Sequence, residues 1–173
     1  MSAWCPDAGD LQRNSLVLLR TLILLTLLTM APTLRAQEPA VALVGIGFAS
    51  IRLTAQSLAA LPVAEREVTF ETSKGPATRR YKGVLLWDVL QTNKALDGLK
   101  PAEQLKKTFL VSAGDGYQIA FSVGEIHPDF GNLPLILASA ADGRTLDGGW
   151  RLVAPGDRRG ARAVYEVVKI ELR

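Results

Sequence analysis

The chain has 173 residues and a formal net charge of +3, from 20 lysines and arginines against 17 acidic residues. Nucleic-acid binding relies on strongly basic surfaces, so this mild imbalance excludes nucleic acid as an expected partner. Cys5 is the only cysteine, which excludes a disulfide-stapled scaffold and a cluster of thiolate metal ligands.

The first 36 residues have the layout of a secretory signal. Arg20 precedes an uncharged, leucine-rich run over residues 21–34, and Ala36 offers a small residue at the cleavage point. The run is shorter than the roughly 20 residues that span a bilayer. We therefore expect residues 1–36 to be removed on secretion to the periplasm, leaving residues 37–173 as a single domain. The alternative is an uncleaved segment that tethers the protein to the membrane.

The rest of the sequence predicts a β-rich α+β domain with short helices. Alternating or short apolar runs predict strands, and Thr54 and Ser122 are suited to cap helical turns. Turns are expected at Gly75, Gly116 and Gly143. In the first half of the chain we expect a strand over 41–48, a helix over 54–61, strands over 68–72 and 78–81, and a helix of VLLWDVLQ opened by Gly83. A helical turn after Pro101 follows, and then a hairpin of 109–111 with 117–121 and a helical turn over 123–127. The last expected elements are strands over 133–138, 152–153 and 164–172.

The stretch from Gly148 to Arg162, GGWRLVAPGDRRGAR, is the most distinctive part of the sequence. Trp150 and Arg151 precede a glycine- and proline-rich loop that carries Arg158 and Arg159. Guanidinium groups on such a loop suit planar or phosphorylated anions, because each presents a rigid fork of donors. The alternative is a solvated basic loop.

Four segments, in this order, resemble the oxidoreductase molybdopterin-binding domain, which has the sulfite-oxidase fold. They are YKGVLLWDVL, SAGDGYQIAFSVGEI, LASAADGRTL and WRLVAPGDRRGARAVYEVVKIEL, and IRLTAQSLAALP fits the first strand and helix of that family. The resemblance covers nearly all of residues 37–173. It implies a β-rich, mixed-sheet α+β fold with short helices.

One departure from this family bears on function. Its enzymes carry a cysteine just after the strand that corresponds to residues 68–72, and the cysteine sulfur is a molybdenum ligand. Here Glu71 to Lys74 reads ETSK, and residues 37–173 contain no cysteine. A hydroxyl does not replace a thiolate on a soft, high-valent metal centre without changing its electronics. Small secreted members of the fold without this cysteine resemble periplasmic pterin-binding sensor proteins.

The resemblance therefore implies a non-catalytic periplasmic domain that binds a pterin rather than molybdopterin. It also implies that occupancy is relayed to the periplasmic domain of a membrane signalling protein. Two alternatives stay open: a molybdopterin-dependent oxidoreductase without the usual cysteine ligand, and an interaction module whose pocket is vestigial.

A pterin is a flat ring that needs an aromatic or guanidinium face and fixed polar groups at its edge. Trp150 is the expected stacking face, Trp87 is assigned to the core, and His127 is expected in a surface loop. Arg159 and Arg162 match the family loop that holds the cofactor's phosphate and pterin edge. We expect no catalytic or metal-ligating residue. The expected ligand-binding residues are Trp150, Arg151, Arg159, Arg162, Tyr117, Asp115, Ser73 and Lys74.

Overall fold

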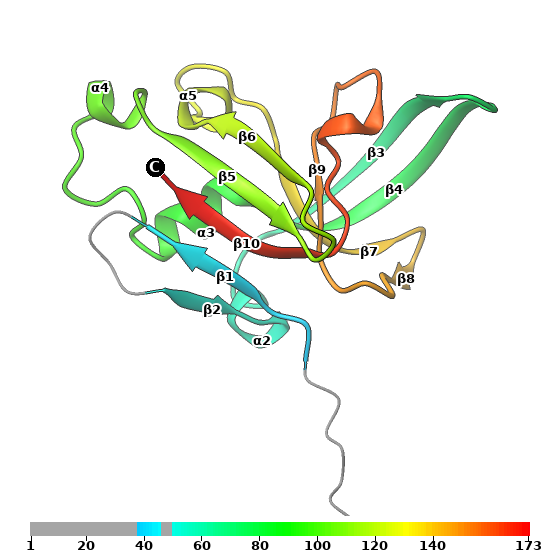
Figure 1. Ribbon diagram of the computed structural model, residues 1–173, viewed down its shortest axis with the longest axis horizontal. Coiled ribbons are helices and arrows are strands. Elements are labelled where there is room, and N and C mark those ends of the chain that lie inside the picture. Colours follow the sequence, from blue (N-terminus) through cyan, green and yellow to red (C-terminus); the bar gives the residue numbers. More distant parts are fainter. Residues whose placement is uncertain (1–37, 46–49) are drawn as a thin grey trace, which may run out of the picture. The chain divides into compact units, whose positions relative to one another are not determined.

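The computed structural model describes residues 38–45 and 50–173, which form two five-stranded sheets (Figure 1). The predicted signal and residues 46–48 of the expected opening strand lie outside the described residues. No helix of the described part is long and apolar enough to cross a membrane. The mixed sheets and short helices confirm the predicted α+β class.

The first sheet has the strand order β2-β1-β10-β5-β6. Its central pair, β1 with β10, is parallel, and the other pairs are antiparallel. Its strands are β1 (Val41–Val44), β2 (Ile51–Leu53), β5 (Thr108–Ala113), β6 (Gln118–Ser122) and β10 (Val167–Leu172).

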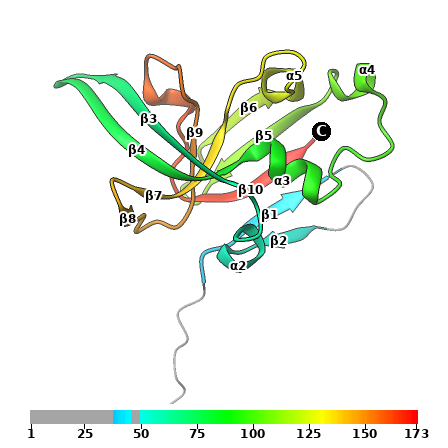
Figure 2. The same ribbon diagram turned by 180° about the vertical axis from the view of Figure 1, so that it is seen from behind.

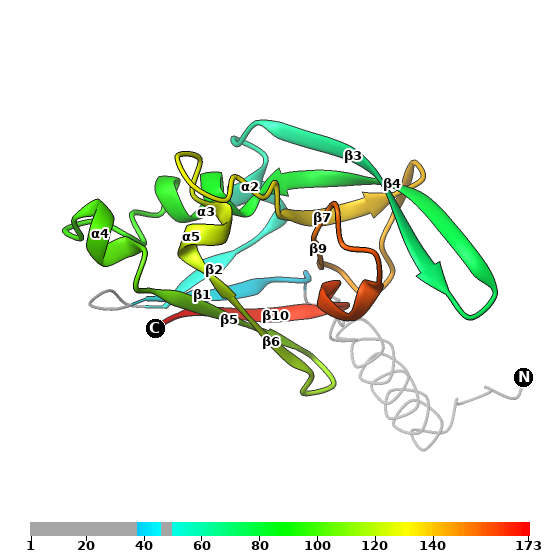
Figure 3. The same ribbon diagram turned by 90° about the horizontal axis from the view of Figure 1, so that it is seen from above.

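The second sheet has the order β3-β4-β7-β8, with β9 also paired to β7, and all its pairs are antiparallel. Figure 3 shows β3, β4 and β7 as one layer beside that of β1, β10 and β5. Its strands are β3 (Val63–Thr72), β4 (Gly75–Leu85), β7 (Ile136–Ala141), β8 (Arg144–Thr145) and β9 (Arg151–Val153).

Short helices connect the strands, and the two caps that the sequence predicted, at Thr54 and Ser122, are present. The Thr54 hydroxyl accepts a hydrogen bond from the Ser57 N–H at 3.2 Å. The Ser122 hydroxyl accepts from the Gly124 N–H, and the Glu125 carboxylate accepts in return from the Ser122 N–H, both at 3.1 Å. The helices are α2 (Ala55–Leu58), α3 (Leu86–Thr92), α4 (Pro101–Gln104), α5 (Val123–Ile126) and the 3-10 turn η1 (Gly160–Arg162).

The structure corrects where the third predicted helix begins. Val84 and Leu85 were expected in this helix, but they end strand β4 and pair with Leu137 and Ile136 of β7. Helix α3 begins only at Leu86. A short apolar run fits a buried strand as well as a buried helix, so only the pairing with β7 distinguishes them.

Two apolar clusters lie on opposite faces of the second sheet. Leu137 and Leu152 belong to the larger cluster, which also contains the stacked rings of Phe109 and Phe121. Their neighbours Ile136 and Val153 belong to the smaller cluster, because successive side chains of a strand point to opposite faces. The centre of this sheet is therefore buried on both sides.

The segment after β9 covers the smaller cluster. Ala163 belongs to this cluster, as does Phe70 of β3, and the Arg158 carbonyl accepts a hydrogen bond from the Glu71 N–H at 2.9 Å. Figures 1 and 2 show this loop beside the β3–β4 hairpin, whose far end extends past the other strands. The covering segment, residues 154–166, is called the return segment below.

Replacing Gly83 with alanine is expected to lower the free energy of unfolding by about 1–3 kcal/mol. A Cβ there would lie 2.1 Å from the Leu137 carbonyl oxygen, and this backbone group cannot give way without disturbing the β4–β7 pairing. Chemical denaturation of the full-length chain measures the loss. Gly114→Ala is the matched control, since its Cβ would meet its nearest neighbour at 3.6 Å. Equal stability of the two variants would contradict the close packing.

Candidate functional site

Arg151 is a buried arginine on a short strand that is covered on both faces. Leu152 enters the larger apolar cluster and Val153 the smaller one. Because side chains alternate along a strand, Arg151 lies on the Val153 face, and only 5% of it is exposed. The sequence left open whether this side chain points inward or into solvent, and its burial shows that it points inward.

Two tyrosine rings flank the Arg151 guanidinium. Its Cζ lies 3.6 Å from the ring centroid of Tyr165 and 5.1 Å from that of Tyr81. Each such contact stabilises a cation by about 0.5–2 kcal/mol. Burial raises the pKa of the Tyr81 phenol, and the nearby charge of Arg151 lowers it by less. Tyr81 is therefore neutral at physiological pH and supplies no counter-charge to the guanidinium.

Arg151 has no anionic partner among the described residues. None of their carboxylates forms an ion pair with it, and its buried Nε–H group has no hydrogen-bond acceptor there. A buried charge is costly unless it is paired and hydrogen-bonded, and such unsatisfied groups are informative exceptions in folded proteins. This guanidinium is suited to an acceptor that comes from a ligand.

A pocket of about 210 Å³ adjoins this guanidinium, and we call it the Arg151 pocket. It is smaller than the range of about 300–1,000 Å³ that is usual for drug-sized ligands, so it suits one small ring system. Aromatic, cationic and acidic side chains all contribute to its wall. The lining residues are Leu146, Asp147, Gly148, Gly149, Trp150, Arg151, Tyr165 and Glu166.

Trp150 lines this pocket, but most of its surface belongs to the core. It is only 6% exposed, joins the larger apolar cluster, and donates its Nε1–H to the Pro39 carbonyl at 3.3 Å. Tyr165, which is 63% exposed, has far more ring surface open to a ligand. The structure thus favours Tyr165 over Trp150 as the stacking face.

A second hollow, of about 270 Å³, is lined in part by residues of the return segment. Tyr117 and Asp115 line it together with Tyr165, which also lines the Arg151 pocket. The Tyr117 hydroxyl donates to the Ala161 carbonyl at 2.7 Å, and an Asp115 carboxylate oxygen accepts from the Tyr117 N–H at 2.9 Å. The predicted residues of this hairpin therefore lie near the return segment, although their polar atoms are engaged within the fold.

Arg162 is neutralised within the protein. Its Nε and Nη2 donate to the two carboxylate oxygens of Asp157 at 2.8 and 2.6 Å, and its Nη1 donates to Glu125 at 2.8 Å. The hydrogen bonds to Asp157 raise the pKa of this guanidinium further above its usual value, and the Glu125 hydrogen bond adds to the rise. These bonds tie the return segment to helix α5, which indicates a structural role rather than a free anion-binding group.

The other predicted residues lie apart from the Arg151 pocket. Arg159 is exposed on the return segment. Ser73 and Lys74 are exposed at the tip of the β3–β4 hairpin (Figures 1 and 2), where the Thr72 hydroxyl accepts from the Lys74 N–H at 3.1 Å and donates to the Gly75 carbonyl at 2.7 Å. These bonds are ordinary turn chemistry. None of the three residues lines the Arg151 pocket.

The loop that begins at His127 is exposed over residues 128–132, as expected, but the His127 side chain itself is buried. His127 is only 8% exposed. Its ring packs edge-on between Trp87 and Phe130, at centroid distances of 4.7 and 5.0 Å. Its Nδ1 accepts a hydrogen bond from the Asp129 N–H at 3.1 Å. In the part of the chain that the structure describes, no three His, Cys, Asp or Glu side chains gather in an arrangement suited to a metal ion.

Sequence reasoning missed Tyr81, Tyr165 and Glu166. Tyr165 and Glu166 occur in the segment ARAVYEVV, where they interrupt the alternation expected of a terminal strand. Glu166 has a left-handed backbone with φ of 47°, and β10 begins only after it, at Val167. The break in the strand pattern was the available signal.

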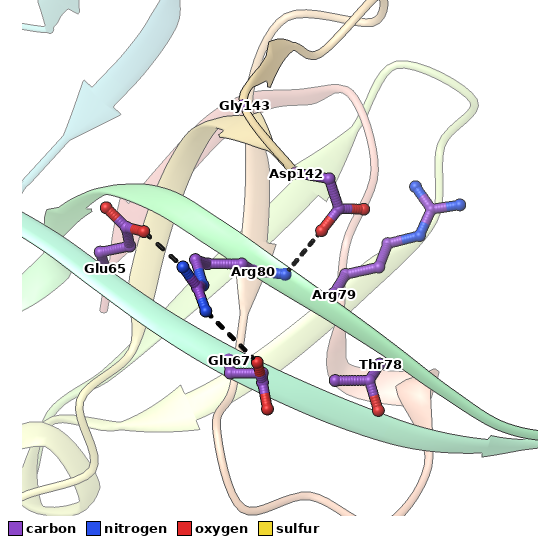
Figure 4. Close-up of a pocket in the computed structure, with 7 residues that line it drawn as sticks. All are labelled: Glu65, Glu67, Thr78, Arg79, Arg80, Asp142 and Gly143. Atoms are coloured by element: carbon purple, nitrogen blue, oxygen red, sulfur yellow. Dashed lines mark hydrogen bonds and ion pairs between the residues drawn. The ribbon is translucent and has the colours of Figure 1, made fainter.

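A hollow of about 400 Å³ lies along the β3–β4 hairpin (Figure 4) and is a weaker candidate. Arg80 lies 3.8 Å from Glu65 and 3.7 Å from Glu67, and its backbone N–H donates to Asp142 at 2.9 Å. Arg80 and both glutamates are exposed, so water screens their charges. These ion pairs are typical of a solvated sheet surface.

No family model matches the sequence, and no curated protein matches it. Among solved structures, the chain is similar to the sulfane dehydrogenase SoxCD from Paracoccus pantotrophus, with a TM-score of 0.57 and 20% sequence identity. The similarity covers 77% of this chain and 37% of that one. At this identity the likeness shows the fold alone, and it supports a distant sulfite-oxidase-like fold.

Arg162→Met is expected to lower the free energy of unfolding by about 1–2 kcal/mol. The charge-assisted bonds to Asp157 and Glu125 are lost, and partial exposure of the cluster reduces the effect. Chemical denaturation of the full-length variant measures this change, with the exposed Arg159→Met as control. Unchanged stability in Arg162→Met would contradict a structural role for the ion cluster.

Proposed function

We propose that this domain binds a pterin, or a closely related flat heterocycle, in the Arg151 pocket. The observation that carries the proposal is the buried Arg151 guanidinium, which adjoins a small pocket and has no anionic partner among the described residues. The distant sulfite-oxidase-like fold supports a pterin-type ligand in particular.

The groups around the pocket match the needs of such a ring. Tyr165 contacts Arg151 on one side and is 63% exposed, so part of its ring surface is open for stacking. Stacking contributes about 1–3 kcal/mol, and a hydrogen bond to a charged group about 1.5–3 kcal/mol. Micromolar affinity requires about 8 kcal/mol. One stack, the guanidinium and one or two further polar contacts are enough.

The residues at the positions where the family holds its cofactor do not fit a molybdenum centre. The position where the family's cysteine stands is occupied by Thr72, Ser73 and Lys74 at a hairpin tip, and their hydroxyl and ammonium groups are poor ligands for a soft metal. Arg162, the family's candidate for the cofactor's anionic groups, is neutralised by its own carboxylates. We therefore propose ligand binding and derive no redox step.

We also propose that the domain lies in the periplasm and relays pterin occupancy to a membrane signalling protein. The apolar leader in residues 1–36 supports secretion. The absence of a cysteine from residues 37–173, together with the fold, is typical of pterin-binding sensor domains that report to a membrane protein. An interaction module with a vestigial pocket would use the same surface without a ligand.

Arg151→Met is expected to weaken pterin binding by about 10- to 100-fold, because a charge-assisted hydrogen bond of about 1.5–3 kcal/mol is removed. Fluorescence titration of the full-length protein with pterin measures the affinity. Stability is expected to stay the same or to rise, since an apolar side chain replaces an unpaired buried charge.

Two further variants complete the test. Arg159→Met is the matched control and is expected to bind normally, because Arg159 is exposed and lies outside the pocket. Tyr165→Ala removes an exposed ring and is expected to weaken binding without unfolding the domain. A wild-type protein that does not bind pterin, or an Arg151→Met variant that binds it equally well, would overturn the proposal.

A further inference from the structure

We infer that the Glu166 carboxylate accepts hydrogen bonds from the N–H donor edge of the bound ring. The Arg151 pocket therefore selects 2-amino-4-oxo heterocycles over 2,4-dioxo ones. This inference rests on the proposed function and specifies the chemical class of its ligand. It starts from a second group on the pocket wall, the carboxylate of Glu166.

The fold provides a dedicated place for the Glu166 side chain. A Cβ added at Gly148 would lie 2.4 Å from Glu166 Cγ, and one added at Gly114 would lie 3.6 Å from Glu166 Oε2. Any side chain at Gly148 would therefore displace the glutamate. Within the described residues, the carboxylate forms no ion pair and no side-chain hydrogen bond. Its acceptor oxygens are free to meet a ligand.

The backbone at Glu166 is held in an unfavourable conformation. Its φ of 47° lies in the left-handed region, which suits glycine and raises the energy of other residues. The Glu166 carbonyl accepts from the Gly114 N–H at 2.9 Å, and the Val167 N–H donates to the Trp150 carbonyl at 2.8 Å. Hydrogen bonds to neighbouring segments thus hold the strained Glu166 beside the pocket. Residues with a strained backbone cluster at ligand sites.

Arg151 and Glu166 give the pocket wall opposite hydrogen-bonding characters. The guanidinium only donates, and the ionised carboxylate only accepts. A 2-amino-4-oxopteridine has acceptors at its 4-oxo group and N5, and donors at N3–H and the 2-amino group. A carboxylate can accept two parallel N–H bonds from that donor edge, as it does from arginine. Both groups are satisfied by one ring of this kind.

The hydrogen-bonding groups of a 2,4-dioxo ring do not complement both Arg151 and Glu166. Lumazine carries an oxygen in place of the 2-amino group, so an acceptor would face the Glu166 carboxylate. Sites that hydrogen-bond a substrate group reject analogues without it by up to about 10⁴- to 10⁵-fold when buried. Because Glu166 is exposed to water, we expect a smaller preference, of about 10- to 100-fold for pterin.

Asp97 is the matched control, because it is an exposed carboxylate that does not line the Arg151 pocket. Asp97→Asn changes the charge of the protein by the same amount as Glu166→Gln does, and it leaves the pocket wall intact.

The test is a fluorescence titration of the full-length protein with pterin and with lumazine, for wild type, Glu166→Gln and Asp97→Asn. We expect wild type and Asp97→Asn to prefer pterin by at least about tenfold. Glu166→Gln should lose the preference, because the glutamine amide can donate to the 2-oxo group of lumazine. Thermal unfolding of each variant confirms that it is folded.

The outcomes separate this inference from the proposed function. Equal binding of both rings by wild type would overturn the selectivity while leaving the pterin site intact. A preference that survives in Glu166→Gln, or disappears in Asp97→Asn, would overturn the role of Glu166. A wild-type protein that binds neither ring would overturn both the site and its selectivity.

Discussion

Burial of the second sheet on both of its faces is the constraint on which the rest of the domain depends. The larger apolar cluster covers one face, and the return segment covers the smaller cluster on the other. β9 lies between these two clusters, so the Arg151 side chain is removed from water. It forms no ion pair with a carboxylate of the described residues. The candidate site is thus a direct consequence of how the chain covers its own sheet.

The arginines of one short stretch have different roles because their neighbours differ. Arg162 meets Asp157 and Glu125 and becomes part of the scaffold. Arg151 meets two tyrosine rings, which stabilise its charge without neutralising it. Arg159 is exposed to solvent. A guanidinium can recognise a ligand only if the fold has not already given it an anion.

The fold by itself does not specify the chemistry of this site. The likeness to SoxCD is at 20% identity and spans 37% of that chain, and one fold supports many functions. We propose recognition rather than electron transfer, since the groups at the site are a guanidinium that donates hydrogen bonds, a carboxylate that accepts them, and aromatic rings. These groups suit the edge and face of a heterocycle, and they do not resemble the ligand set of a soft metal.

Local signals in the sequence determined the fold class, most strands and two of the helix caps. Thr54 and Ser122 cap their helices because capping depends on residues only three positions apart. The boundary of β4 could not be found this way, because Val84 and Leu85 are strand residues only through their pairing with β7. The burial of His127, which was expected in a surface loop, could not be predicted for the same reason: the Trp87 ring that packs against it comes from helix α3.

The sequence also identified Trp150 and Arg151 as candidate site residues from their place before the basic loop. Only the tertiary structure decided that Arg151 is buried and unpaired, that Arg162 is neutralised, and that Tyr165 and Glu166 complete the pocket. The physical reason is that hydrogen bonding, ion pairing and desolvation depend on residues that are distant in sequence. Composition and spacing determine which groups are present, and packing determines which of them stay available to a ligand.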